Sequence, residues 1–152
     1  MEILIRPYQK EDHDSFKQLN LEWLEHYHLT ETHDMLILDD PEGTVTTRGG
    51  FIWMAEADGN IVGSAGIMKE KDGEYELIKM GVTESYRGKG ISKLLLDQCL
   101  SKAREIGAKK LSLYSNHQLA TAITLYEKYG FYHVELVNSP LETADIRMEM
   151  IL

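Results

Sequence analysis

Arg87-Gly88-Lys89-Gly90-Ile91-Ser92 is the stretch of this 152-residue sequence that decides the fold. It stands between a predicted strand, Tyr75 to Val82, and a predicted helix, Gly90 to Ile106. The first amides of a helix have no partner inside the helix and lie at its positive end, so they bind phosphate, and glycine lets the backbone approach such a ligand closely. Arg87 and Lys89 add two positive charges. The segment therefore predicts a phosphate-binding strand, loop and helix.

A purely structural interpretation of this segment also stays open, in which Gly88 and Gly90 only make a tight turn that carries two solvated cations. Two other phosphate-binding motifs are excluded. A Walker A loop requires four residues between its first glycine and a Gly-Lys pair that precedes Ser or Thr, and Gly81 is too far from Gly88-Lys89. A Rossmann fingerprint requires a third glycine where this sequence has Lys93.

Outward from this segment, the hydrophobic pattern predicts a mixed α/β fold. Two hairpins precede it, with turns at Asp58-Gly59-Asn60 and Lys71-Asp72-Gly73, and helices alternate with strands after it. The segment from Glu31 to Asp40 is ambiguous, and a second short helix is one interpretation of it. The predicted strands are 3–6, 51–57, 61–69, 75–82, 111–114, 131–137 and 145–152, and the other predicted helices lie within 12–28 and over 120–129.

Length and composition limit the class of protein. A chain of this length is expected to form one domain, residues 1–152, with a core that needs no disulfide or metal. A single cysteine and the lack of a recognisable secretory leader predict a cytoplasmic location. No apolar run approaches the roughly 20 residues that cross a bilayer, so no membrane partner is expected. A net charge of −9 and a pI near 5.1 argue against nucleic acid as a partner.

Three runs in the second half of the chain carry a wider resemblance: Met80-Gly81-Val82, Tyr86 to Leu95, and Ala122 to Phe131. Together they resemble the GNAT superfamily of N-acetyltransferases, in which an Arg-x-x-Gly-x-Gly/Ala loop is followed by a Leu-Tyr-Glu-Lys-x-Gly-Phe run. The resemblance implies a GNAT-type fold, with a central, mostly antiparallel mixed sheet flanked by helices. It also implies an enzyme that moves the acetyl group of acetyl-CoA to a primary amine by direct attack in a ternary complex.

The same resemblance implies how the acetyl-CoA is bound. Backbone groups of Met80 and Val82 would hydrogen-bond the pantetheine arm where two strands splay apart. Ser92 replaces the usual Gly or Ala, which a small residue at a helix start tolerates. Leu119 stands where many members have an Asn that contacts the cofactor, and Asn116 is the candidate substitute. The residues expected to hold the pyrophosphate, through their main-chain amides, are Arg87, Gly88, Lys89, Gly90, Ile91 and Ser92.

Acetyl transfer needs a neutral amine, a stabilised oxyanion and a proton for the leaving thiolate. Tyr126 matches the family tyrosine near the CoA sulfur, and a phenol can donate that proton. Without the family match, composition favours Tyr126 as an apolar-face residue of its helix beside Leu125, and the family match reverses that preference. Glu76 stands in the strand that ends at Met80-Gly81-Val82, where some GNAT enzymes keep a glutamate that removes the amine proton. Two interpretations of Glu76 stay open, a general base and a solvated edge residue. A backbone amide near Val82 would stabilise the oxyanion.

The acceptor side has no motif of its own. Trp23 and Tyr27 stay open between core residues and substrate-binding residues, since the resemblance implies that the first helix and the loop after it line the acceptor site. A small-molecule amine and a peptide amine both stay open as partners, as does a homodimer. The alternative function is a catalytically silent CoA-binding regulatory module with the same fold. A cationic acceptor is expected because six carboxylates crowd this region: Glu22, Glu25, Glu31, Asp34, Asp39 and Asp40. Acidic residues on a first helix are usually a solvated face, however, and that alternative stays open.

The histidines and the cysteine are interpreted as structural. His26, His28 and His33 lack the spacing of metal ligands, because residues two apart on a helix face different ways, so no metal is expected. A free cysteine behaves as a small hydrophobic residue. The buried stripe of the helix after the loop is expected to consist of Ile91, Leu94, Leu95 and Cys99.

Overall fold

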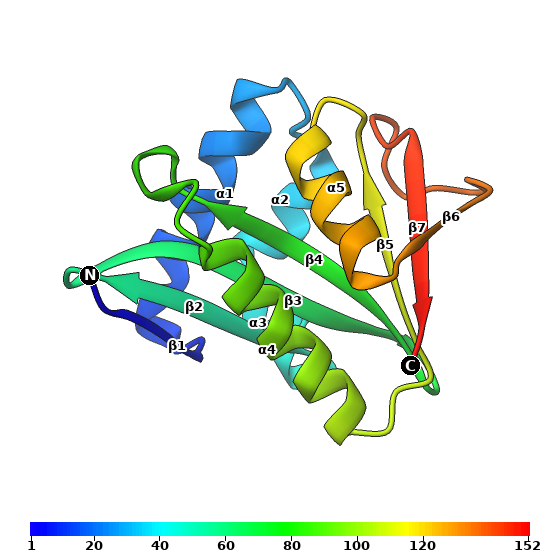
Figure 1. Ribbon diagram of the computed structural model, residues 1–152, viewed down its shortest axis with the longest axis horizontal. Helices are drawn as coiled ribbons and strands as arrows, with labels where there is room; N and C mark the ends of the chain where they lie inside the picture. The colour runs from blue at the N-terminus through cyan, green and yellow to red at the C-terminus, as the bar shows by residue number, and fades with distance from the viewer.

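Seven β-strands form one sheet in the computed structural model of the protein (Figure 1). They are β1 (Ile3–Pro7), β2 (Phe51–Ala57), β3 (Asn60–Lys71), β4 (Glu74–Val82), β5 (Lys110–Ser115), β6 (Tyr132–Val134) and β7 (Ile146–Ile151). Their order across the sheet is β1-β2-β3-β4-β5-β7-β6. Every neighbouring pair is antiparallel except β4 and β5, which are parallel.

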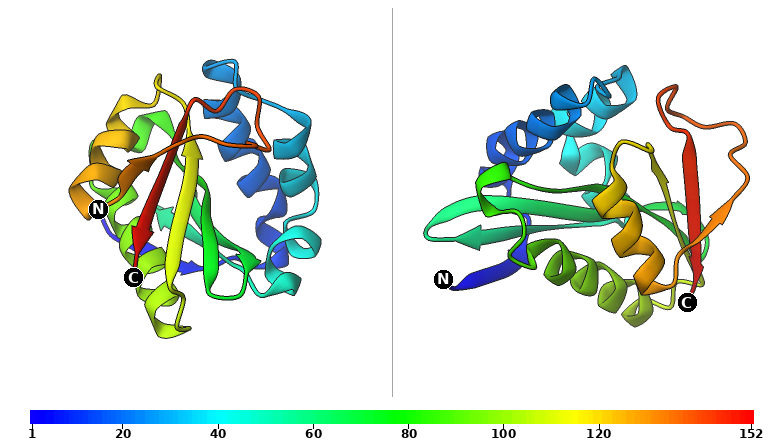
Figure 2. Two further views of the ribbon diagram at one scale, coloured as in Figure 1. Left: turned by 90° about the vertical axis from the view of Figure 1, so that its right-hand side faces the viewer. Right: turned by 45° about the horizontal axis from the view of Figure 1, so that its top comes forward.

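Helices cover both faces of this sheet. α1 (His13–His26), α2 (Thr32–Asp39) and the short α3 (Pro41–Thr44) come before β2, and α4 (Ile91–Glu105) and α5 (Ala120–Tyr129) come after β4. Figure 2 shows α1 and α2 on one face, with α4 and α5 on the other. None of the helices combines the length and the apolar character that crossing a bilayer requires.

Alternation along the strands builds a core on each face. In β2, Trp53 and Ala55 belong to the core under α4, while Ile52 and Met54 belong to the core under α1. Complete burial of a large apolar side chain is worth about 1.5–3 kcal/mol, so these two layers supply most of the drive for folding. Because alternate side chains of β2 are buried on opposite faces, the strand belongs to the middle layer of a three-layer fold, with helices on either side.

The structure confirms most of the predicted elements, decides the one that was open and corrects two details. The segment over residues 31–40 is helical and forms α2. Leu94 is 41% exposed, because the buried stripe of α4 continues through Leu96 rather than through Leu94. The predicted strand over residues 131–137 is only three residues long, since β6 is an edge strand that pairs with β7 alone and Val137 is 55% exposed.

The parallel pair β4 and β5 separates after a short contact. Its register runs only from Glu74 opposite Lys110 to Glu76 opposite Ser112. Beyond this point β4 stays paired with β3 as far as Val82, while β5 stays paired with β7 along its length, so the two strands diverge (Figure 1). The divergence opens the middle of the sheet between the carboxyl ends of the two strands.

A β-bulge interrupts β4 beside this opening. The ladder between β3 and β4 shifts between the pair Ser64 and Gly81 and the pair Gly66 and Ile78. Lys79, within the shift, has a φ of 48° in the left-handed region. A bulge takes its extra residue out of the ladder. Backbone groups of this segment are therefore released from pairing with β3 next to the opening.

Candidate functional site

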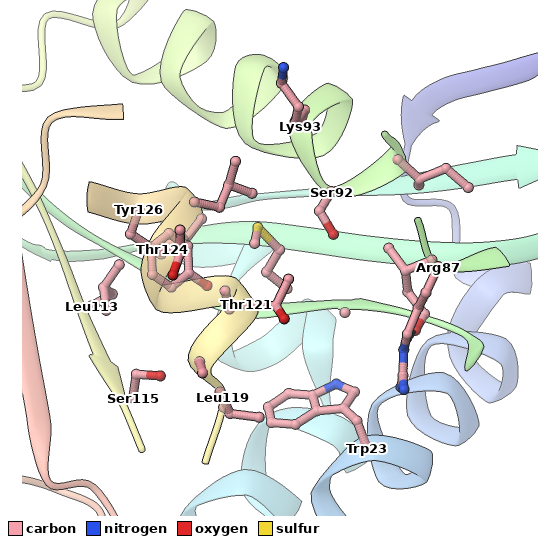
Figure 3. A pocket seen from close by; sticks show the side chains of 18 of the residues that line it. Trp23, Arg87, Ser92, Lys93, Leu113, Ser115, Leu119, Thr121, Thr124 and Tyr126 are labelled. Carbon is pink, nitrogen blue, oxygen red and sulfur yellow. Dashed lines mark hydrogen bonds between the residues drawn. The ribbon is translucent and has the colours of Figure 1, made fainter. Parts of the chain in front are cut away.

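A cavity of about 880 Å³ fills the opening between β4 and β5 (Figure 3). The carboxyl half of β4 and the end of β5 form two of its walls. The first turn of α4 and one face of α5 form a third, and Trp23 of α1 and Tyr27, directly after α1, also line the cavity. The cavity thus joins segments that are far apart in the chain, and it includes the loop that precedes α4.

That loop presents a row of free hydrogen-bond donors. The backbone amides from Gly88 to Lys93 have no hydrogen-bond partner in the protein. Gly88 and Gly90 have φ values of 75° and 81°, which side-chain-bearing residues rarely adopt, and this conformation turns the chain into α4. Successive free amides at the positive end of a helix form an anion-binding concavity. The local geometry therefore fits a phosphate group.

Two cationic side chains accompany these amides. The Arg87 Nε donates to the Val82 carbonyl at 3.0 Å, which ties the guanidinium to the end of β4, and Arg87 lines the cavity. Lys89 is exposed and its side chain does not line the cavity, whereas its backbone amide belongs to the free row, so its role through that amide stays a prediction. Lys93, one helical turn beyond Gly90, lines the cavity instead.

Met80 and Val82 both line the cavity, at the end of β4 that the bulge interrupts. Gly81 lies between them under the indole of Trp23. A Cβ atom at Gly81 would lie 2.5 Å from the Trp23 Nε1, which real contacts do not reach. Only glycine therefore lets the indole pack on this strand.

Tyr126 of α5 is buried at the wall of the cavity, as Figure 3 shows. Its ring packs edge-on against Phe131 at 5.6 Å between centroids, and its hydroxyl has no hydrogen-bond partner in the protein. Burial raises the pKa of the Tyr126 hydroxyl, because desolvation disfavours the phenolate. The hydroxyl consequently stays protonated at neutral pH and is free to donate to a ligand atom.

Glu76 lines a second cavity of about 80 Å³, on the α1 and α2 face of the sheet. The two cavities share part of their walls, including Trp23 and Leu119. Glu76 is only 7% exposed, so the interpretation of this residue as a solvated edge residue is wrong. Burial is the main cause that raises the pKa of Glu76 well above its usual value, and the neighbouring Glu70 carboxylate raises it further. Glu76 thus has the environment of a proton acceptor, a role that stays a prediction.

Asn116 does not have the predicted place at the cofactor cavity. Its Nδ2 donates to the Thr143 carbonyl at 2.8 Å, and its Oδ1 accepts from the Gln118 amide at 3.0 Å. It lines the smaller cavity, not the larger one. Since both ends of its amide are engaged within the protein, Asn116 holds the loop before β7 and is not available as a substitute for the family Asn.

Five of the six acidic residues around α1 and α2 have structural partners, and Glu25 lines neither cavity, which removes the argument for a cationic acceptor that rested on them. Glu31 accepts from the Thr143 hydroxyl at 2.6 Å, and Asp34 forms a buried ion pair with Lys79. The other partners are the Thr83 hydroxyl for Glu22, Lys17 for Asp39 and the Gly43 amide for Asp40. Of the six carboxylates, only Asp34 lines either cavity.

Several lining residues were missed from the sequence. Thr121, Thr124 and Lys128 of α5 recur at steps of three and four, a spacing that places them on one helical face with Tyr126 nearby, so the signal was present. No comparable signal marks Leu113, Tyr114 and Ser115 of β5, because they line the cavity only where the strands diverge. No cluster of three or more His, Cys, Asp or Glu side chains suited to a metal occurs in the structure.

Comparisons with known proteins agree with this geometry. The model of the acetyltransferase (GNAT) family matches residues 2–131. The uncharacterized N-acetyltransferase YjgM of Escherichia coli is 32% identical over 117 residues, which is 75% of this chain and 70% of the relative. The mammalian N-acetyltransferases that the chain matches are covered over less than half of their length.

Solved structures show the same fold. An acetyltransferase of the GNAT family from Staphylococcus aureus superposes with a TM-score of 0.91 at 22% identity, over 99% of both chains. The PaiA N-acetyltransferase of Thermoplasma acidophilum, solved in complex with coenzyme A, superposes with a TM-score of 0.78 at 19% identity over 100% of both chains. The predicted fold class, a mostly antiparallel mixed sheet flanked by helices, is confirmed.

Gly81→Ala should destabilise the fold by forcing the Trp23 indole off β4. Overpacking of this kind costs typically 1–3 kcal/mol. The free energy of unfolding in urea checks the value, and the same substitution in a Trp23→Ala background is the control, since no indole is then displaced. An equal loss in both backgrounds would contradict the contact between Gly81 and Trp23.

Glu76→Gln should stabilise the protein at neutral pH, and increasingly so as the pH rises. The folded state raises the pKa of Glu76, so the stability that Glu76 contributes is present below its unfolded pKa and is lost as the pH rises through its folded pKa. Gln does not titrate. Melting temperatures of both proteins from about pH 5 to pH 8 test this linkage.

Glu74→Gln is the matched control for this pH series, because the side chain lies on the same strand with the opposite shift. The Lys110 ammonium lowers the pKa of Glu74, so its removal should not stabilise the protein at any of these pH values. A difference between wild type and Glu76→Gln that is constant with pH would refute the buried, titrating state of Glu76.

Proposed function

The chain belongs to the acetyltransferase (GNAT) family, and from this premise we propose that it transfers the acetyl group of acetyl-CoA to a primary amine by direct attack in a ternary complex. A single observation carries the proposal. The cavity between β4 and β5 connects a row of free backbone donors with a neutral buried phenol, and it shares a wall with the cavity that contains Glu76.

The start of α4 suits the phosphate end of acetyl-CoA. The free amides from Gly88 to Lys93 would hold the pyrophosphate, and the Arg87 and Lys93 side chains would add charge. The arm would then follow the end of β4, where Met80 and Val82 line the cavity. The complex of the Thermoplasma acidophilum relative with coenzyme A supports this choice of co-substrate.

Each chemical step has a residue in a suitable state. The bond from the amine nitrogen to the acetyl carbon forms as the carbon–sulfur bond breaks. Glu76 would take the amine proton, and its raised pKa brings the base closer to neutral pH, where general bases work best. Tyr126 would donate its proton to the departing sulfur, so that coenzyme A leaves as a thiol, because the Tyr126 hydroxyl is protonated and has no other partner. Backbone amides at the bulge near Met80 would face the developing oxyanion.

The smaller cavity limits the acceptor end that can approach Glu76. One water molecule requires about 10–15 Å³ of cavity volume, so the smaller cavity of about 80 Å³ has room for roughly five to eight water molecules. Leu24, Leu29, Ile37 and Leu141 make much of its wall apolar. We infer that only a compact amine-bearing end enters, with its ammonium toward Glu76, and that the rest of a larger small-molecule or peptide acceptor stays outside.

Acetyl-CoA should raise the melting temperature of the protein. At 100 times the Kd the stabilisation is about 2.7 kcal/mol. Substitution of Arg87 or Lys93 by Gln should reduce the shift, while Lys89→Gln, at a side chain outside the cavity, should leave it unchanged. No shift at millimolar acetyl-CoA would sink the proposal. A shift without CoA release in a screen over amine classes would favour the regulatory module.

Tyr126→Phe should lower kcat by roughly 10²–10⁴-fold with little change in acetyl-CoA affinity, because only the proton donor is lost. Folding stability should not fall, since the hydroxyl has no hydrogen-bond partner to lose. The control is Tyr129→Phe on the same helix, whose hydroxyl donates to Asp97 at 2.6 Å outside the cavity. A Tyr126→Phe enzyme with wild-type kcat would remove Tyr126 from the reaction.

A further inference from the structure

Lys79 is the one non-glycine residue within a β-strand of this protein that has a positive φ, at 48°. The left-handed conformation is unfavourable for a lysine, whose side chain makes no local hydrogen bond to the turn. Such a conformation persists only where the surroundings hold it, and it concentrates at functional sites. The contacts that hold Lys79 are therefore informative about the site.

A buried chain of hydrogen bonds holds the backbone of Lys79. The Ser64 hydroxyl on β3 donates to the Lys79 carbonyl at 2.8 Å. The Asn20 Nδ2 on α1 donates to the Ser64 hydroxyl at 3.1 Å, and the Asn20 Oδ1 accepts from the Trp23 Nε1 at 3.0 Å. Asn20 and Ser64 are both 0% exposed. We refer to Asn20 and Ser64 with these bonds as the polar relay.

The side chain of Lys79 is held from a different element. Its ammonium pairs with Asp34, and both side chains are almost completely buried. The other oxygen of Asp34 accepts from the Glu31 amide at 2.9 Å, at the start of α2. The left-handed residue is thus fixed twice, through its carbonyl by the polar relay and through its ammonium by α2.

The two ends of the polar relay lie at two parts of the candidate site. One end is the bulge, directly before Met80 and Gly81 in the cavity wall. The other end is the indole of Trp23, which packs on Gly81 and lines both cavities. Asn20 and Ser64 themselves line neither cavity. Packing alone does not require them, because a pair of apolar residues could fill the same space without hydrogen bonds.

We propose that Asn20 and Ser64 are positioning residues for acetyl transfer, which fix Lys79 in its left-handed conformation and Trp23 against Gly81. The inference rests on the proposed function. The polar relay keeps the backbone after the bulge and the aromatic wall in one arrangement at the junction of the two cavities. A displacement of about 1 Å at a reacting centre can reduce a rate by 10²-fold, so the effect of the polar relay should fall on kcat.

Ser64→Thr and Ser64→Val test the proposal, because the two side chains have the same shape and only threonine keeps the hydroxyl. Ser64→Val should lower kcat on the order of 10- to 100-fold with an unchanged Kd for acetyl-CoA, and Ser64→Thr should retain kcat. Asn20→Leu should give a similar loss, and the double variant should lose little more, since both act through one network. Ser64→Ala, which adds no atoms, should show the same loss if branched residues do not fold.

A measurement without substrate separates this inference from the proposed function. In Ser64→Val, and not in Ser64→Thr, the NMR signals of the Met80 and Gly81 amides and of the Trp23 indole N–H should shift. These shifts support the polar relay even if no amine is acetylated, in which case only the proposed function fails. Unchanged signals overturn the inference, as does wild-type kcat in a Ser64→Val protein that is folded but melts at a lower temperature.

Discussion

The site depends on how short the parallel contact between β4 and β5 is. Three residue pairs join the strands, and after them each strand keeps its pairing with its other neighbour. Because β4 stays paired with β3 and β5 with β7, the two strands cannot come together again beyond this contact. An opening therefore remains between them, where backbone groups lack a strand partner. Helices on both faces border this opening, which is why a ligand-sized cavity and a smaller one meet there.

Burial has a different chemical consequence at each part of this site. It raises the pKa of Tyr126, which keeps a donor protonated, and it raises the pKa of Glu76, which brings an acceptor toward neutral pH. The start of α4 instead stays open to solvent and presents backbone amides. The arrangement separates an anion-binding end from a desolvated end, as a cofactor with a charged head and a reactive tail requires.

Local features of the site could be predicted from the sequence, and features that depend on distant partners could not. Gly88 and Gly90 mark the anion-binding turn because their conformation is a property of the turn itself. The raised pKa of Glu76 depends on its burial at a cavity that α2 helps to line and on the neighbouring Glu70, and the engagement of Asn116 depends on Thr143, so neither has a sequence signal. Most partners of the acidic residues around α1 and α2 are also distant in sequence, so the sequence does not indicate them. The single-domain organisation of residues 1–152 stays a prediction.

The most direct test of the account is a crystal structure of the protein with bound coenzyme A. We expect the pyrophosphate on the amides between Gly88 and Lys93, the pantetheine arm between β4 and β5, and the sulfur within hydrogen-bonding distance of the Tyr126 hydroxyl. Coenzyme A bound with its arm outside the opening, or with its sulfur away from Tyr126, would contradict the account.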